Sequence, residues 1–148
     1  MTVLSIYDDL DHLVSVADPL GYIASNTYDA VGNRISFTDP AGGLTSYSYD
    51  PLNQLAEVTD AMGGTVHYNY DIIGNMISMT DANGYTTNYA YDPLNRPISI
   101  IDPLGYTTSN AYDAVGNRIG LTDAAGSITS YSYDPSVANT STQHTPKQ

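Results

Sequence analysis

The sequence contains no cysteine and no tryptophan, only four Lys or Arg residues and a single Glu. Without cysteine, the chain has no disulfide framework, no thiolate metal site and no cysteine nucleophile. Sixteen acidic residues give a net charge of −12, which repels phosphate backbones and anionic bilayers. We therefore expect neither nucleic acid as a partner nor insertion into a membrane.

Long apolar runs are also missing. The opening MTVLSIYDDLDHLVSV lacks the basic start and the continuous apolar stretch of a signal peptide. No run approaches the roughly 20 apolar residues of a membrane span. Any export must therefore use another route or a leader that has been removed.

The residue types that are abundant favour strands and turns. Fifteen of the sixteen acidic residues are Asp, and Tyr supplies fourteen of the fifteen aromatics. Asp, Gly, Pro, Asn, Ser and Thr favour turns, whereas Tyr, Val, Ile and Thr favour strands. The composition predicts many short strands joined by tight turns.

An internal repeat governs the whole chain. The Tyr-Asp pair occurs seven times, each 21 residues after the last and with no insertion: at Tyr7, Tyr28, Tyr49, Tyr70, Tyr91, Tyr112 and Tyr133. A second period of 42 overlies it, because units reading YDAVGN or YDIIGN alternate with units reading YDPLNQ or YDPLNR. Residues 18–35 and 102–119 share DPLGY..SN.YDAVGNRI, which indicates a recent duplication of an 84-residue block.

Each unit is predicted to contain two strands and two turns. In one unit these are a strand at 44–49, a turn at 50–54, a strand at 55–59 and a turn at 60–63. Turns such as DPLG and DAMG place Asp first and Gly fourth, as type I turns prefer, and YDAVGN places Gly where positive φ is inexpensive.

The predicted fold is all-β. We expect tandem 21-residue β-hairpin repeats that form a spiralling or solenoid-like antiparallel sheet of about thirteen strands, because large open sheets tend to curl. A closed compact barrel is the alternative architecture. The repeat array is expected to span residues 1–135, as six units plus partial ends, and to be followed by a polar tail at 136–148.

Alternation assigns the faces of the sheet. The residues seven and nine after each repeat Tyr are apolar, and we expect this column, which includes Ile77 and Ile100, to be buried. Their neighbours are mostly Ser or Thr and are expected to face water. The repeat Tyr shares its face with the residue two before it, which is Tyr in four units, so a Tyr ladder is also expected.

These motifs resemble the YD repeats of Rhs proteins, of the shell-forming subunits of insecticidal Tc toxins and of the teneurin ectodomain. The resemblance is carried by the Tyr-Asp pairs, the Gly-Asn-Arg motifs at 32–34 and 116–118, the Asp-Pro-Leu-Gly turn and the Tyr-x-Tyr-Asp return, over about residues 1–135. It implies successive hairpins in a sheet that spirals into a hollow shell, which encloses a toxin in some members. It implies a scaffold and no chemistry.

The toxin-type members also carry a plug, many more repeats, a self-cleaving region and a variable toxin. The sequence shows none of these parts. DPLGY at 102 continues into an ordinary repeat, so no cleavage residues are carried over.

The candidate sites are few. Stacked turn carboxylates could attract Ca²⁺, but each Asp has a local role in its own turn and no GGxGxD repeat occurs. The three histidines are scattered, and no Gly-x-Ser-x-Gly elbow is found. We therefore expect no catalytic residue, no metal site and no cofactor. Four exposed tyrosines could stack on sugar or could instead pack across strands: Tyr47, Tyr68, Tyr89 and Tyr131. A single sequon marks Asn139 as a possible glycosylation site.

Two functions follow as hypotheses. The first is a non-enzymatic structural protein that assembles head to tail with copies of itself into an extracellular or cell-surface filament or shell, because the array begins and ends with strands and has no evident caps. The polar tail from Ser136 could cap the array or be donated as a strand to a neighbour. The second is a carbohydrate-binding or shell fragment module of a larger Rhs system.

Overall fold

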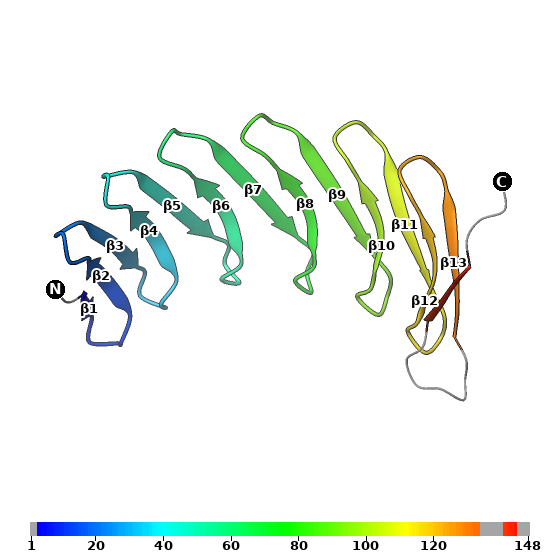
Figure 1. Cartoon of the computed structure of the whole chain (residues 1–148), viewed down its shortest axis with the longest axis horizontal. Helices are drawn as coiled ribbons and strands as arrows, with labels where there is room; N and C mark the ends of the chain where they lie inside the picture. The colour runs from blue at the N-terminus through cyan, green and yellow to red at the C-terminus, as the bar shows by residue number, and fades with distance from the viewer. Residues whose placement is uncertain (1–2, 134–140, 145–148) are drawn as a thin grey trace. The chain divides into compact units, whose positions relative to one another are not determined.

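The structure, a computed structural model, describes residues 3–133 and 141–144. These residues form fourteen β-strands and no helix, and the strands follow one another in chain order in an antiparallel sheet (Figure 1). The predicted all-β, solenoid-like fold of tandem hairpins is therefore confirmed. Since the described residues contain no helix, none of them forms a helix that could span a membrane.

The strands are four to six residues long, as a 21-residue repeat with two strands and two turns requires. They are β1 Leu4–Tyr7, β2 Leu13–Ala17, β3 Ile23–Tyr28, β4 Arg34–Thr38, β5 Leu44–Tyr49, β6 Leu55–Thr59, β7 Thr65–Tyr70, β8 Met76–Thr80, β9 Thr86–Tyr91, β10 Pro97–Ile101, β11 Thr107–Tyr112, β12 Arg118–Thr122, β13 Ile128–Tyr133 and β14 Ser141–His144.

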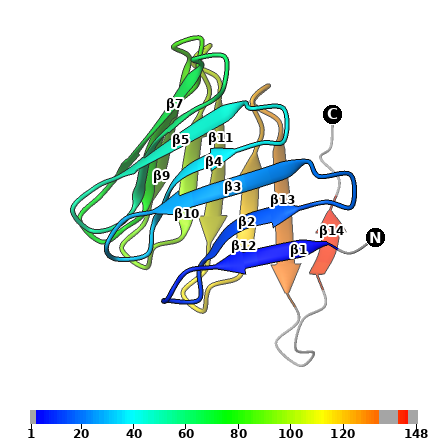
Figure 2. The ribbon, with the colours of Figure 1, turned by 90° about the vertical axis from the view of Figure 1, so that its left-hand side faces the viewer.

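The chain divides into two compact units. The first consists of Met1–Asn69 and Thr80–Gly84, and the second consists of Tyr70–Met79 and Tyr85–Gln148. Strands β1 to β6 lie in the first unit, where β1, β2 and β3 lie side by side (Figure 2). Strands β9 to β14 lie in the second.

The hairpins that follow a repeat Tyr contain a β-bulge. In the β3–β4 hairpin, Thr27 pairs with Ser36 but Tyr28 pairs with Arg34, so Ile35 has no opposite residue. The register shifts at the equivalent place in the β1–β2, β5–β6, β9–β10 and β11–β12 hairpins. A bulge adds one residue to one strand and increases the local twist.

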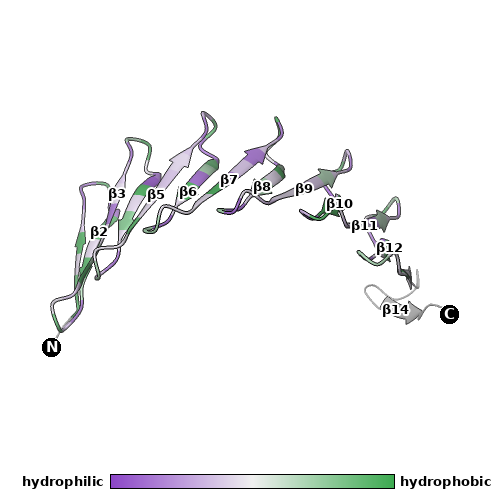
Figure 3. Ribbon diagram, turned by 90° about the horizontal axis from the view of Figure 1, so that it is seen from above, coloured by the Kyte–Doolittle hydropathy of each residue, from purple (hydrophilic) through white to green (hydrophobic). Residues whose placement is uncertain are grey.

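The apolar column and the Tyr ladder share one face. In the first unit Tyr47 lies opposite Val58, which in turn lies opposite Val66. In the second unit Tyr89 lies opposite Ile100. Residues on the other face are mainly Ser and Thr, and the ribbon shows apolar and polar segments alternating within the strands (Figure 3). The apolar face with its Tyr side chains is called the aromatic face below.

The expectation that this column is buried was wrong. No described residue is buried, and the side chains of Ile77 and Ile100 keep 39% and 36% of their surface exposed. Alternation shows which residues share a face, but burial needs a second layer on that face. The described residues provide none, so the aromatic face stays open to solvent.

We predict that Val58→Asp lowers the free energy of unfolding by about 1–3 kcal/mol, because it places a charge between Tyr47 and Val66 on the aromatic face. The matched variant Ser46→Asp, on an exposed position of the neighbouring strand's polar face, should cost less than about 0.5 kcal/mol. Urea denaturation measures both. Equal losses would contradict this assignment of the two faces.

Candidate functional site

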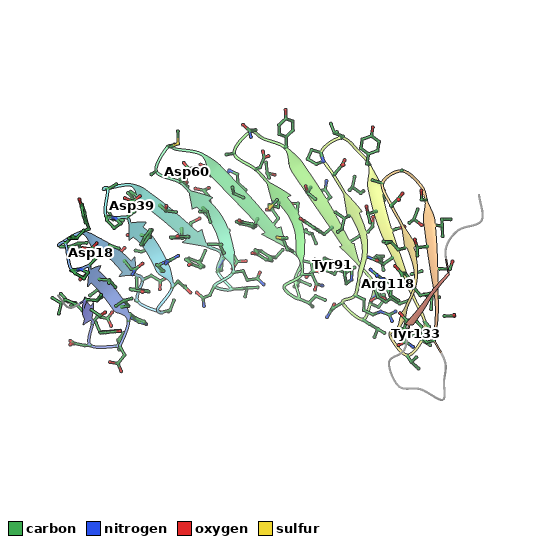
Figure 4. All side chains as sticks on the ribbon, viewed as in Figure 1. Asp18, Asp39, Asp60, Tyr91, Arg118 and Tyr133 are labelled. Atoms are coloured by element: carbon green, nitrogen blue, oxygen red, sulfur yellow. The ribbon has the colours of Figure 1, made fainter. Side chains whose placement is uncertain are left out.

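Every turn in the described chain closes on the carboxylate of its first residue. In the turn after β5, Asp50 Oδ1 accepts hydrogen bonds from the backbone N–H groups of Leu52 at 2.8 Å and Gln54 at 2.9 Å. The Asn53 N–H also donates to the Asp50 carbonyl at 3.0 Å. Three such residues, Asp18, Asp39 and Asp60, mark every second turn of the first unit (Figure 4). Twelve turns have this Asp: residues 8, 18, 29, 39, 50, 60, 71, 81, 92, 102, 113 and 123.

The fourth residue of each turn adopts positive φ, which favours Gly and which Asn and Asp tolerate better than other residues. It is Gly32 in a YDAVGN turn, with φ of 92°, and Asn53 in a YDPLN turn, with φ of 61°. The YDAVGN and YDPLN turns therefore share a positive φ at their fourth residue, although one has Gly there and the other Asn.

Side-chain hydrogen bonds between turns account for the 42-residue period. Asn33 Nδ2 donates to Asp29 Oδ2 at 2.9 Å in its own turn and to Asn53 Oδ1 of the next YDPLN turn at 3.1 Å. In the second unit, Asn75 makes the same bonds to Asp71 and Asn95. The two turn types alternate because one supplies the amide donor and the other the acceptor.

These contacts also lower the pKa of several turn carboxyls. The Asn33 amide holds the pKa of Asp29 below its usual value, assisted by backbone N–H groups, and the amides of Asn75 and Asn117 act in the same way on Asp71 and Asp113. No group of three or more His, Asp or Glu residues that could hold a metal occurs in the described ranges. The lone pairs of the turn carboxylates are instead used by backbone and amide donors.

The repeat Tyr links neighbouring hairpins. The ladder between β4 and β5 ends at the Ser36–Ser46 pair, and beyond it the Tyr49 hydroxyl donates to the Arg34 carbonyl at 2.9 Å. In the second unit, Tyr91 donates to the Met76 carbonyl at 3.0 Å. The equivalent bonds of Tyr28, Tyr112 and Tyr133 end on the carbonyls of Leu13, Pro97 and Arg118. Each hydroxyl thus joins two strands where they have no backbone pairing.

The four tyrosines proposed to stack on sugar are not equivalent. The guanidinium of Arg34 lies 4.7 Å from the ring centroid of Tyr47, and that of Arg118 lies 4.9 Å from that of Tyr131. Each of these rings therefore has a cation on one face. In the part of the chain that the structure describes, Tyr68 and Tyr89 have neither an arginine on the ring nor a hydrogen bond to the hydroxyl. The possible glycosylation site Asn139 lies outside the described residues.

Sequence reasoning missed the arginines. All three arginines place the guanidinium against a Tyr ring. The third, Arg96, lies 4.6 Å from the ring centroid of Tyr112. The Gly-Asn-Arg motif was a usable signal, since it places Arg34 and Arg118 six residues after a repeat Tyr. The hydrogen bond from each of these arginines to the hydroxyl of the Tyr thirteen residues later became visible only in the structure.

Comparison with known families identifies the repeat. The RHS Repeat family model matches residues 28–65, 49–84, 70–107 and 112–136, which together make up more than half of the chain. The chain belongs to the RHS repeat family. The matched ranges contain ten of the twelve turn aspartates and the repeat tyrosines from Tyr28 to Tyr133.

Solved structures with the same fold come from Tc toxins. A chain of the Photorhabdus luminescens Tc holotoxin pore is 20% identical, with a TM-score of 0.62, over 87% of this chain and 9% of its own length. The TcdB2–TccC3 structure without the hypervariable C-terminal region is 19% identical, with a TM-score of 0.69, over 95% of this chain and 10% of its own length. The RHS chain thus spans about a tenth of the matched toxin chains. No curated protein sequence matches it.

We predict that the repeat Tyr hydroxyl stabilises the RHS fold. Tyr91→Phe should lower the free energy of unfolding by about 1 kcal/mol, because it leaves the Met76 carbonyl without this donor. Tyr89→Phe, on the same strand and face, removes a hydroxyl that has no described partner and should have almost no effect. Urea denaturation of both variants measures the difference. A loss of the same size in Tyr89→Phe would show that the hydrogen bond contributes nothing.

Proposed function

We propose that this RHS chain is a non-enzymatic structural protein that assembles head to tail with copies of itself. The observation that carries the proposal is the state of its first strand. All four residues of β1 are exposed, and in the described chain β1 pairs only with β2. An unpaired strand edge offers backbone donors and acceptors to another chain.

The other end of the array differs from the first. β13 pairs with β14, so the segment Ser141–His144 covers the last full repeat strand. This pairing corresponds to the first of the two roles that the sequence left open for the tail from Ser136, a cap on its own array or a strand donated to a neighbour. In an assembly, β1 of one copy would pair with β14 of the next copy, or would replace β14 on β13. Because the two edges are different, the contact is heterologous and generates a filament or a closed shell.

The apolar surface supports the same role. Leu4 and Ile6 of β1 keep 59% and 49% of their surface exposed, and the aromatic face has no covering layer in the described residues. Large exposed apolar surfaces are typical of protein–protein contact sites. An extracellular or cell-surface filament or shell would use both the β1 edge and the aromatic face as contact surfaces. This role agrees with the fold that the chain shares with Tc toxin chains.

We predict that the protein associates at micromolar concentration and that Leu4→Lys combined with Ile6→Lys makes it monomeric, because charges on an edge strand oppose strand addition. The control combines Ala90→Lys and Ala111→Lys, which add the same charge at exposed positions of the inner strands β9 and β11. Sedimentation velocity and electron microscopy measure both variants. A wild-type monomer at all concentrations, or equal dissociation by the control, would reject assembly through β1.

A second candidate function is a carbohydrate-binding or shell segment within a larger RHS protein. It is favoured by the half-exposed rings of Tyr68 and Tyr89, which have no arginine against them. Flat aromatic faces stack on the apolar faces of sugars. On an array of neutral glycans, we predict binding that Tyr68→Ala combined with Tyr89→Ala abolishes. Tyr106→Ala, which removes a 55% exposed ring beside a turn, is the control. An array without binding would reject this candidate and leave the assembly hypothesis untouched.

A further inference from the structure

Two arginines stand apart from the acidic character of the chain. The protein has sixteen acidic residues, yet neither Arg34 nor Arg118 forms an ion pair with a carboxylate of the described residues. Both side chains are exposed at the start of their strands. An exposed, unpaired guanidinium among so many carboxylates requires an explanation.

The side chain of Arg34 is held in one place by its neighbours. Its Nη2 donates to the Tyr47 hydroxyl at 2.9 Å, and its Nη1 lies 3.4 Å from Asn26 Oδ1. The guanidinium also lies over the rings of Tyr47 and Phe37, with 5.7 Å to the centroid of Phe37. A guanidinium carries five N–H donors, so three of them keep no partner among the described residues.

The second unit contains the same arrangement. Arg118 Nη2 donates to the Tyr131 hydroxyl at 3.3 Å, and Nη1 lies 3.4 Å from Asn110 Oδ1. The Asn110 amide is itself fixed by donating to the Pro97 carbonyl at 3.1 Å, as the Asn26 amide is by the Leu13 carbonyl at 2.9 Å. Tyr133 lies beside Arg118 and donates to its carbonyl (Figure 4). Each unit thus presents one oriented guanidinium on its aromatic face.

Arg96 shows what a satisfied arginine looks like in this fold. It also lies against a ring, that of Tyr112, but its Nε donates to Asp92 Oδ2 at 2.7 Å and its Nη1 to the Asp113 carbonyl at 3.0 Å. Its charge is therefore neutralised inside the protein. The contrast identifies Arg34 and Arg118 as the arginines with free donors.

We propose that Arg34 and Arg118 each form a binding site for the carboxylate of one acidic sugar carried on an otherwise neutral glycan. The guanidinium binds a planar carboxylate through two parallel N–H donors. The adjacent Tyr hydroxyl and Asn amide bind hydroxyl groups of the same sugar ring. The proposal goes beyond the second candidate function, because it names an acidic sugar as the ligand and assigns it to residues other than Tyr68 and Tyr89.

Two features of the molecule favour this ligand over others. The net charge of −12 repels a polyanion, so one carboxylate on a neutral body is the better match. None of the described residues is buried, so the site is an open surface that cannot enclose a flexible chain. A rigid sugar ring loses less conformational freedom on such a surface than a peptide does.

Nuclear magnetic resonance titration of the whole chain tests the proposal. Methyl β-glucuronide should shift the Nε–H signals of Arg34 and Arg118 with a dissociation constant on the order of millimolar, and should leave Arg96 unchanged. The neutral methyl β-glucoside should shift none of the three. Arg34→Gln combined with Arg118→Gln should weaken glucuronide binding at least about tenfold, and Arg96→Gln should leave it unchanged.

Other outcomes would overturn the proposal. Equal shifts at Arg96 would show that any guanidinium of this protein attracts the anion. Equally tight binding of acetate would show a simple anion site, and equally tight binding of a neutral peptide through its C-terminal carboxylate would show a peptide site. Binding of neutral glycans that depends on Tyr68 and Tyr89, without any glucuronide effect at the arginines, would support the second candidate function while rejecting this inference.

Discussion

The rest of the structure depends on one interaction: the carboxylate of the first Asp of each turn accepts hydrogen bonds from backbone N–H groups of that turn. It closes every turn at the same length, whether the turn reads DPLG or DAVGN. Equal turns give equal strand registers, and equal registers place the residues of successive units in columns. The Tyr–carbonyl bonds, the Asn33–Asn53 bond and the contacts of Arg34 and Arg118 with tyrosine rings all require those columns. A turn longer by one residue would move the following strand's side chains to the opposite face.

The stability of this sheet comes from a different source than that of most globular domains. Because no described residue is buried, hydrophobic burial is only partial, and backbone ladders, turn carboxylates and cross-strand pairs must contribute much of the rest. The Tyr hydroxyls add bonds where the ladders between hairpins end. The aromatic face nevertheless has no covering layer among the described residues.

Much of the fold could be predicted from the sequence because its rules are local. The Asp and Gly positions indicate turns, and the period of two along strands indicates which residues share a face, as Ile35 and Phe37 illustrate. The bulge at Ile35 and the positive φ of Asn53 were not predicted, since both depend on how a hairpin closes. Burial was predicted wrongly, because an apolar column specifies one surface and says nothing about what covers it.

The residues of the candidate site could likewise be predicted only in part from the sequence. The sequence by itself determined the repeat length, the hairpins, the two faces and the recurrence of Tyr and Gly-Asn-Arg, because each depends on residues within one or two units. Only the tertiary structure decided that Arg34 covers Tyr47, that Arg118 covers Tyr131, and that the half-exposed rings of Tyr68 and Tyr89 have no arginine against them. These contacts depend on the register between strands and on side-chain directions across them, which spacing along one strand does not specify.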